Sequence, residues 1–210
     1  MAKEVQEIKR ESEKKIQELK LQLQETPGNT DLPKEDPVEE FFRESLCPNN
    51  DKERRYLKSL LGNKEFVLTL LYRASKEDAM AEGTKHKTKA EYFHRMCDNK
   101  GPTVSLMKLN NGSCIGGYTS SKWRTPPSSF LGAHQYDNSA LLFNLTNEVS
   151  YPIVKAEKAI FCFRNNGPCF GDEELYVGEN FFDENQCKSF SGQYAYDVKT
   201  RNVNTNLLTN

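Results

Sequence analysis

One histidine and one cysteine stand close enough along the chain to share chemistry. His94 and Cys97 are three residues apart in a segment with helical spacing, which places an imidazole and a thiol one helical turn apart. Such a pair could supply half of a zinc site, but zinc needs four clustered ligands and the chain contains no CxxC pair. The spacing therefore favours a structural or surface role for both residues over metal binding.

The thiols are the other groups that could react. The chain has six, at Cys47, Cys97, Cys114, Cys162, Cys169 and Cys187. A nucleophilic cysteine needs a nearby histidine or helix N-terminus to lower its pKa, and the sequence pattern shows neither. Cys162 and Cys169 flank a predicted turn and could approach each other across it, but buried free thiols are the more common state of cysteine.

Common signatures for binding phosphates, metals or an activated nucleophile do not occur in the sequence. We therefore expect a protein that is not an enzyme and that uses neither a cofactor nor a metal. A basic run covers residues 85–89 and is either a solvated face or a surface for an acidic partner such as a phosphoinositide or a protein. The net charge of −1 gives no overall basic field, which argues against nucleic acid as a partner.

Membrane and secretion signals are also missing from the sequence. No apolar run approaches the roughly 18 residues that a transmembrane helix requires, and the first 25 residues are too charged for a signal peptide. We expect an intracellular, cytoplasmic protein, which could attach to an organelle surface or the cytoskeleton. In that reducing compartment the cysteines would remain free thiols.

The element that organises the chain is a predicted β-hairpin over residues 103–119. Two apolar, strand-like runs flank Asn111 and Gly112, residue types that supply the positive φ angles of a tight hairpin turn. Gly116 and Gly117 lie inside the second strand and predict either a bulge or the close approach of another backbone. Tyr118 and Trp123 are large enough to pack against them.

Other elements follow from shorter patterns. Asp51 can cap a helix that Gly62 ends, Thr88 and Glu91 fit a capping box, and Ala90, Phe93, Met96 and Cys97 would face inward from the helix that follows. Residues 64–72 predict a strand covered on both faces, residues 76–87 a mobile loop, and residues 125–137 an irregular loop. Further short strands are predicted at residues 140–145, 159–163, 174–177 and 194–196.

The first 25 residues predict an amphipathic helix. The residues of its apolar stripe, which Ser12 interrupts, are spaced three or four apart. This spacing has a period near 3.6 and is not a strict heptad. Such a helix needs a partner surface, which could be a second copy, another protein or the domain itself. Candidate partner-binding residues are Val5, Ile8, Ile16, Leu19 and Leu23. Residues 26–50 have the composition of an acidic, proline-containing linker, and residues 51–210 form the domain.

Several motifs, occurring in the right order, resemble the TLDc domain. They are LLYRAS at 70–75, CDNKGPT at 97–103, GGYTS at 116–120 with Trp123, LLFNLTN at 141–147, EKAIFC at 157–162, GPCFG at 167–171 and LYV at 175–177. The resemblance covers about residues 57–197. Its motif positions, which we interpret as structural, are Gly101, Pro102, Gly116, Gly117, Tyr118, Trp123, Gly167 and Gly171.

The resemblance implies an α+β fold, a two-sheet antiparallel β-sandwich flanked by short helices, here preceded by the amphipathic helix. It also implies oxidation resistance and binding to the vacuolar proton-pumping ATPase (V-ATPase), with no catalytic residues to carry over. The chain lacks the closing strand of the family, so we expect an open strand edge that a partner covers, or a truncated sequence. The alternative function is a structural component of a large assembly, for example cytoskeletal or ciliary, docked or oligomerised through a coiled-coil-like N-terminal helix.

Overall fold

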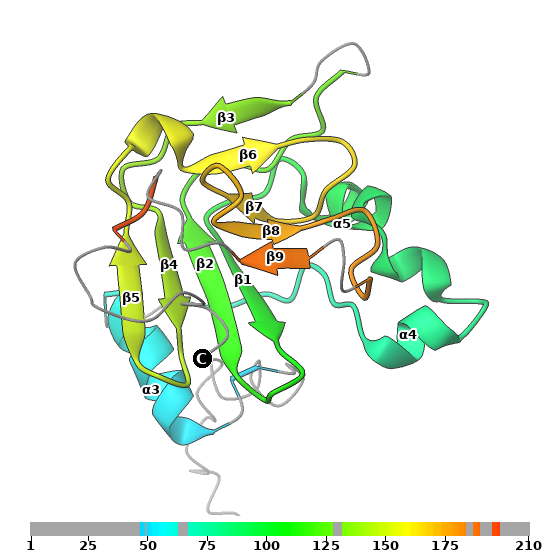
Figure 1. Cartoon of the computed structure of the whole chain (residues 1–210), viewed down its shortest axis with the longest axis horizontal. Coiled ribbons are helices and arrows are strands. Elements are labelled where there is room, and N and C mark those ends of the chain that lie inside the picture. The colour runs from blue at the N-terminus through cyan, green and yellow to red at the C-terminus, as the bar shows by residue number, and fades with distance from the viewer. Residues whose placement is uncertain are drawn as a thin grey trace, which may run out of the picture. The chain divides into compact units, whose positions relative to one another are not determined.

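The computed structural model describes residues 47–48, 50–62, 67–127, 132–183, 187–189 and 195–197, and two antiparallel sheets make up most of it (Figure 1). The predicted helix over residues 1–25, with Val5, Ile8, Ile16, Leu19 and Leu23, lies outside these residues. So does nearly all of the predicted linker over residues 26–50.

The first sheet has the strand order β1-β2-β4-β5 and contains the predicted hairpin. Its strands are β1 (Thr103–Lys108), β2 (Cys114–Thr119), β4 (Leu141–Asn144) and β5 (Val149–Pro152). The turn differs from the prediction, because only Gly112 has a positive φ, at +87°. Leu109 donates its N–H to the Ser113 carbonyl at 2.9 Å, and this encloses a three-residue loop of the bulged type that needs glycine in its last position.

The second sheet has the order β3-β6-β7-β8-β9. Its strands are β3 (Ala133–Gln135), β6 (Ile160–Cys162), β7 (Cys169–Phe170), β8 (Leu175–Val177) and β9 (Cys187–Ser189). The predicted strands at 159–163 and 174–177 are confirmed. Strand β3 falls at the end of the segment predicted as an irregular loop, because a three-residue edge strand carries too little pattern to be recognised and depends on pairing with β6.

Packing between the sheets forms the larger core. Figure 1 shows the strands of the second sheet running across those of the first, and Leu142, Ile160 and Phe170 are buried where the sheets meet. The opposite face of the first sheet is covered by α3 (Asp51–Leu60), whose Leu57 packs with Phe143. Neighbouring residues of β4 thus point to opposite faces, as the period of a strand requires.

The starts of two helices are set by residues other than those predicted. Helix α3 is capped by Asn50, whose Oδ1 accepts the Glu53 N–H at 3.0 Å, and Asp51 is already in the first turn. The predicted capping box at Thr88 does not form, because the Thr88 hydroxyl donates to the Lys85 carbonyl inside the 3₁₀ turn η1 (Lys85–Thr88). Helix α5 (Ala90–Cys97) instead begins with the Ala90 N–H bonded to the Glu179 carbonyl.

Three further predictions, for the buried face of α5 and for the segments at 64–72 and 76–87, are also wrong. On α5, Met96 is 38% exposed and His94 is buried in its place. Residues 67–75 form no regular structure, and Val67 is 74% exposed, so the strand predicted at 64–72 is, in its described part, not formed and not covered on both faces. The segment predicted as a loop holds α4 (Lys76–Met80), which the Ser75 hydroxyl caps, followed by η1.

A second 3₁₀ turn, η2 (Ala156–Lys158), leads into β6. The predicted strand at 194–196 is reduced, in its described part, to one antiparallel bridge between Tyr196 and Ile153. Residues 198–210 are not described, so the predicted lack of a closing strand stays a prediction.

Candidate functional site

Gly116 and Gly117 of β2 make room for two aromatic rings, one on each face of the first sheet. A Cβ atom at Gly117 would lie 2.6 Å from the Phe170 ring, and one at Gly116 would lie 2.8 Å from the Phe143 ring and 2.1 Å from the Ser105 carbonyl oxygen. The pairing of β2 continues through both glycines without the predicted bulge, although the predicted backbone approach is seen at Gly116. The rings that fill the space are Phe143 and Phe170, not Tyr118 or Trp123.

Trp123 links the hairpin to α5. Its indole N–H donates to the Thr103 hydroxyl at 3.0 Å, and its ring meets Phe93 and Phe170 edge-on, each at a centroid distance of 5.6 Å. Gly101 lies under the chain that leads to Trp123, because a Cβ there would be 3.1 Å from the Ser121 carbonyl oxygen. Tyr118 is half-buried and Pro102 is exposed. Gly101 and Trp123 therefore serve packing.

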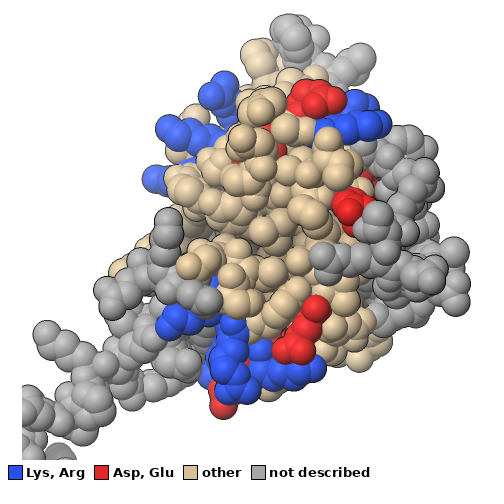
Figure 2. Space-filling model, turned by 90° about the vertical axis from the view of Figure 1, so that its left-hand side faces the viewer, with Lys and Arg blue, Asp and Glu red and all other residues tan. Residues whose placement is uncertain are grey.

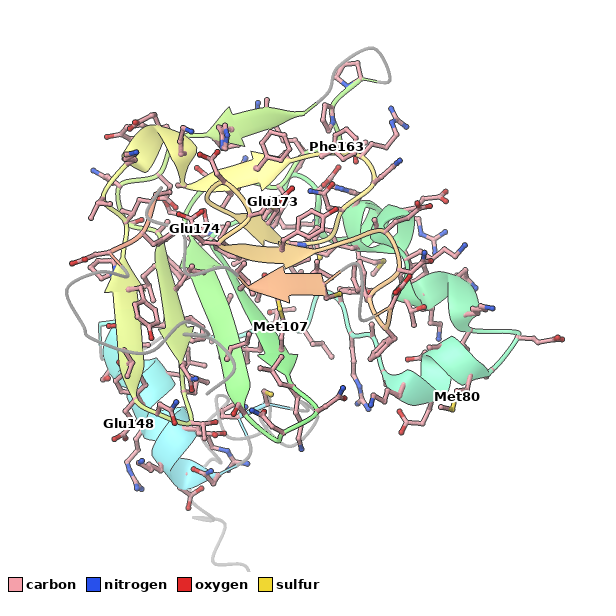
Figure 3. The ribbon with its side chains drawn as sticks, in the orientation of Figure 1. Met80, Met107, Glu148, Phe163, Glu173 and Glu174 are labelled. Carbon is pink, nitrogen blue, oxygen red and sulfur yellow. The ribbon has the colours of Figure 1, made fainter. Side chains whose placement is uncertain are left out.

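Between β7 and β8, Gly171 leaves room for the carboxylate of Glu174, which is labelled in Figure 3. Gly171 has φ +68°, and any side chain there would collide with the Glu174 carboxylate. Glu174 is 1% exposed, and its Oε1 accepts the Ala195 N–H at 2.5 Å. Its Oε2 is buried and has no hydrogen-bond partner among the described residues. Gly167 makes similar room for Phe181, whose ring would be 2.5 Å from a Cβ.

A buried carboxylate, Asp137, gathers the segment that follows β2. Its oxygens accept hydrogen bonds from the Thr119 hydroxyl at 2.7 Å, from the Ser120 N–H at 2.6 Å and from the Ser139 N–H at 2.9 Å. Burial opposes ionisation of Asp137, but these bonds and those from the serine hydroxyls outweigh it and lower its pKa to about 2. Sequence reasoning missed Asp137 and Glu174; for Asp137, the run of hydroxyl residues at 119–121 was the available signal.

Both ring nitrogens of His94 contact hydrogen-bonding groups inside the domain. Its Nδ1 lies 2.8 Å from Asp98 Oδ1, and its Nε2 lies 2.9 Å from the Phe163 carbonyl oxygen. Both neighbours are oxygen atoms that can accept a hydrogen bond from the imidazole ring. Asp98 also accepts from the Thr125 hydroxyl at 2.5 Å. His94 thus joins α5 to the turn after β6 and is not directed at Cys97 as a metal ligand would be.

The thiols are enclosed by the core. Cys47, Cys97, Cys114, Cys162 and Cys169 are buried, and none of the six cysteines is in a disulfide. Burial raises the pKa of the Cys97 thiol to about 12 and that of Cys162 to about 11. Hydrogen bonding to the Cys47 thiol, together with burial, raises the pKa of Cys114. No described group of three or more His, Cys, Asp and Glu residues is arranged to hold a metal ion.

Charge on the surface is mixed. Figure 2 shows lysine and arginine side chains at two ends of one face, with acidic side chains among them and a broad uncharged area between. On α3, Lys52 pairs with Glu148 at 3.5 Å and Arg54 with Asp51 at 3.3 Å. Another network joins Asp172 to Lys158 and, at 2.9 Å, to His134. In the basic run at 85–89, Lys85, His86 and Lys89 are exposed.

Comparison with known proteins places the chain in a family. Among the described helices, none has the length and apolar character needed to cross a membrane. No curated protein and no solved structure gives a significant match. A family model described as the TLDc domain matches residues 50–207, most of the chain, in agreement with the motifs around Gly101, Gly116 and Gly171. The chain therefore belongs to the TLDc domain family.

Proposed function

We propose that this chain is a non-catalytic TLDc protein that acts by binding protein partners, with V-ATPase subunits as the first candidates. The observation that supports this most directly is that most of the described thiols and the histidine on α5 are committed to internal contacts. Five thiols are buried, and His94 is held between Asp98 and the Phe163 carbonyl. A catalytic nucleophile or base must instead reach a substrate.

The same observation bears on oxidative-stress protection. A thiol that reacts directly with oxidants is ionised and accessible, whereas burial raises the pKa of Cys97, Cys162 and Cys169. Protection, as implied by the family resemblance, would then be exerted through the bound partner. Control of a proton pump is a role that needs a binding surface and no reactive group.

The test is an affinity pull-down with the full chain, read by mass spectrometry. The stripe variant carries Ile16→Asp and Leu19→Asp, and its matched control carries Gln6→Asp and Gln17→Asp on the polar side of the predicted helix. We expect V-ATPase subunits with the wild type and both variants. If pump subunits are recovered with none of the three proteins, the proposal is contradicted.

A different outcome would favour the assembly role. If cytoskeletal or ciliary proteins are recovered with the wild type and the control but are lost with the stripe variant, the predicted N-terminal helix is the docking element. The domain would then be carried by that helix, and the proposed pump binding would be wrong.

A further inference from the structure

Strand β1 lies at the edge of the first sheet and, among the described strands, pairs only with β2. Its hydrogen-bond parity follows from the turn, where Leu109 and Ser113 form a bonded pair. Bonded and non-bonded pairs alternate along an antiparallel ladder, so Met107 and Ser105 bond to β2 while Lys108, Leu106 and Val104 do not. The bond from the Leu145 N–H to the Cys114 carbonyl agrees, since it directs Cys114, opposite Lys108, toward β4.

The N–H and C=O groups of Val104, Leu106 and Lys108 therefore point away from the sheet. None of these groups has a hydrogen-bond partner in the part of the chain that the structure describes. The other edge differs, because beyond β5 the segment at 195–197 bridges Ile153 and donates from Asp197 to the Pro152 carbonyl at 2.9 Å. An open edge of six residues is a template for strand addition.

Residues 67–72 have a strand-like sequence and, within the described part of the chain, no strand partner. Leu68 packs against the same buried cluster as Val104 and Leu106, and Leu71 packs against the same buried cluster as Met107, which Figure 3 labels. Within the described residues, the backbone groups of 67–72 make no hydrogen bond. Val67 is 74% exposed and Leu70 is 42% exposed. Strand β1 and residues 67–72 thus pack against the same buried clusters, and both have backbone groups without partners among the described residues. Residues 67–72 also expose apolar side chains to solvent.

The chemistry of this region specifies an occupant. A row of backbone donors and acceptors selects an extended strand, and pockets for alternate side chains select its residues. The exposed Val67 and Leu70 favour apolar residues at alternate positions. Lys108 is exposed and Lys76, which donates to Asn110 Oδ1 at 2.8 Å, is exposed nearby; neither takes part in an ion pair among the described residues. Acidic residues between the apolar ones would meet these charges.

We propose that the outer edge of β1 binds an extended strand of a protein partner in which apolar and acidic residues alternate. The strand adds antiparallel or parallel to Val104, Leu106 and Lys108 and covers the exposed side chains of residues 67–72. This inference rests on the proposed function and deepens it by naming a surface and the chemistry of the partner. Its test uses purified components, so its failure is distinguishable from a failure to recover pump subunits.

Amide hydrogen exchange of the full chain provides the test, with the acetylated and amidated peptide EVEVEVE as the probe. We expect exchange of the Val104, Leu106 and Lys108 amides to slow by at least about tenfold on peptide saturation. The Ser105 and Met107 amides, already bonded to β2, should not change. The peptide KVKVKVK, with the opposite charge, should protect the edge amides far less.

Three results would overturn the proposal. Unchanged exchange with EVEVEVE would show that the edge binds no such strand, and equal protection by both peptides would remove the acidic preference. Edge amides that are already protected without peptide would show another occupant. In that case protection that rises with protein concentration identifies a second copy, and protection that is independent of concentration identifies a segment of the same chain.

A pair of variants checks the site independently. Leu106→Pro removes an N–H that points outward and leaves the β2 ladder intact, whereas Leu106→Ala removes the same packing and keeps the N–H. We expect the proline variant to bind EVEVEVE about tenfold more weakly than the alanine variant. Equal affinities in two folded variants would place the peptide elsewhere, and if the proline variant does not fold, the exchange measurement decides alone.

Discussion

At Gly117 the main chain of β2 lies directly under the ring of Phe170, and the absence of a side chain sets the distance between the two sheets. A Cβ there would lie within 2.6–2.9 Å of three ring atoms. The neighbouring Gly116 has the same relation to Phe143 on the other face. A pair of glycines therefore lets two fully buried rings pack on opposite sides of one strand, which neither residue could allow alone.

Gly117→Ala should lower the free energy of unfolding by about 1–3 kcal/mol, because the added methyl forces the Phe170 ring from its position. Gly83→Ala is the matched control, since nothing lies within 4 Å of its Cβ position, and it should leave stability nearly unchanged. Urea denaturation measures both. The double variant with Phe170→Leu should show non-additive coupling, and simple additivity would contradict the contact.

Asp137→Asn should cost about 1–3 kcal/mol, because an amide cannot accept all the hydrogen bonds that converge on the carboxylate. The wild-type contribution should also depend on pH. The pKa is about 2 when folded and near 3.9 when unfolded, so the unfolded chain takes up the proton first. Stability from Asp137 is complete above about pH 4 and is lost as the pH falls toward about 2.

Denaturant titrations between neutral and acid pH measure this slope. The exposed Glu82→Gln variant serves as the control, and it should follow the wild type throughout. Asp137→Asn should show less loss of stability than the wild type over the acid range. An identical acid slope in wild type and Asp137→Asn would mean that the carboxylate is not held ionised by its hydroxyl and amide donors.

Among the elements, α3 shows how closely a helix start can be tested. Its cap is Asn50, one residue before the Asp51 that the sequence pattern indicated. Asn50→Ala should destabilise the domain by about 1 kcal/mol, while Asn50→Asp, which keeps a capping oxygen, should change little. Thermal unfolding of the two variants makes the comparison. If Asn50→Ala is neutral and Asp51→Ala is costly, the sequence-based assignment of the cap was the better one.

The hairpin and residues 67–72 behave differently as elements, although both have strand-like sequences. The hairpin forms because a short loop brings β1 and β2 together as antiparallel neighbours. Strand β4 then pairs antiparallel with the other side of β2. Residues 67–72 have the apolar composition of a strand, but their backbone pairs with no described segment. A strand needs a partner, and only the tertiary arrangement shows whether one is present.

At the scale of the whole molecule, the enclosed thiols make a prediction about reactivity. At neutral pH, iodoacetamide should label Cys97, Cys114, Cys162 and Cys169 at least about tenfold more slowly in the native chain than in guanidinium chloride. The half-buried Cys187 should label first among the described cysteines other than Cys47. Mass spectrometry of tryptic peptides gives each rate. A thiol that reacts rapidly below neutral pH would instead support a cysteine enzyme.

Much of the fold was predictable, for reasons that particular residues show. The hairpin at 103–119, the strands near Leu142 and Ile160 and the helix ended by Gly62 carry strong local patterns. Strand β3 and the start of α5 were not predictable, because pairing with β6 and a bond to the Glu179 carbonyl create them. The roles of Asp137 and Glu174 depend on partners that are distant along the chain.

By itself the sequence determined the family, the antiparallel hairpin and its glycines, because periodicity, turn residues and motif order are local properties of the chain. Only the tertiary structure decided that Phe143 and Phe170 occupy the space above Gly116 and Gly117 and that His94 contacts Asp98 and not Cys97. It also decided that no described segment pairs with the outer edge of β1. These features depend on which segments meet in space. Contacts between residues far apart in the chain leave no periodic trace in either segment.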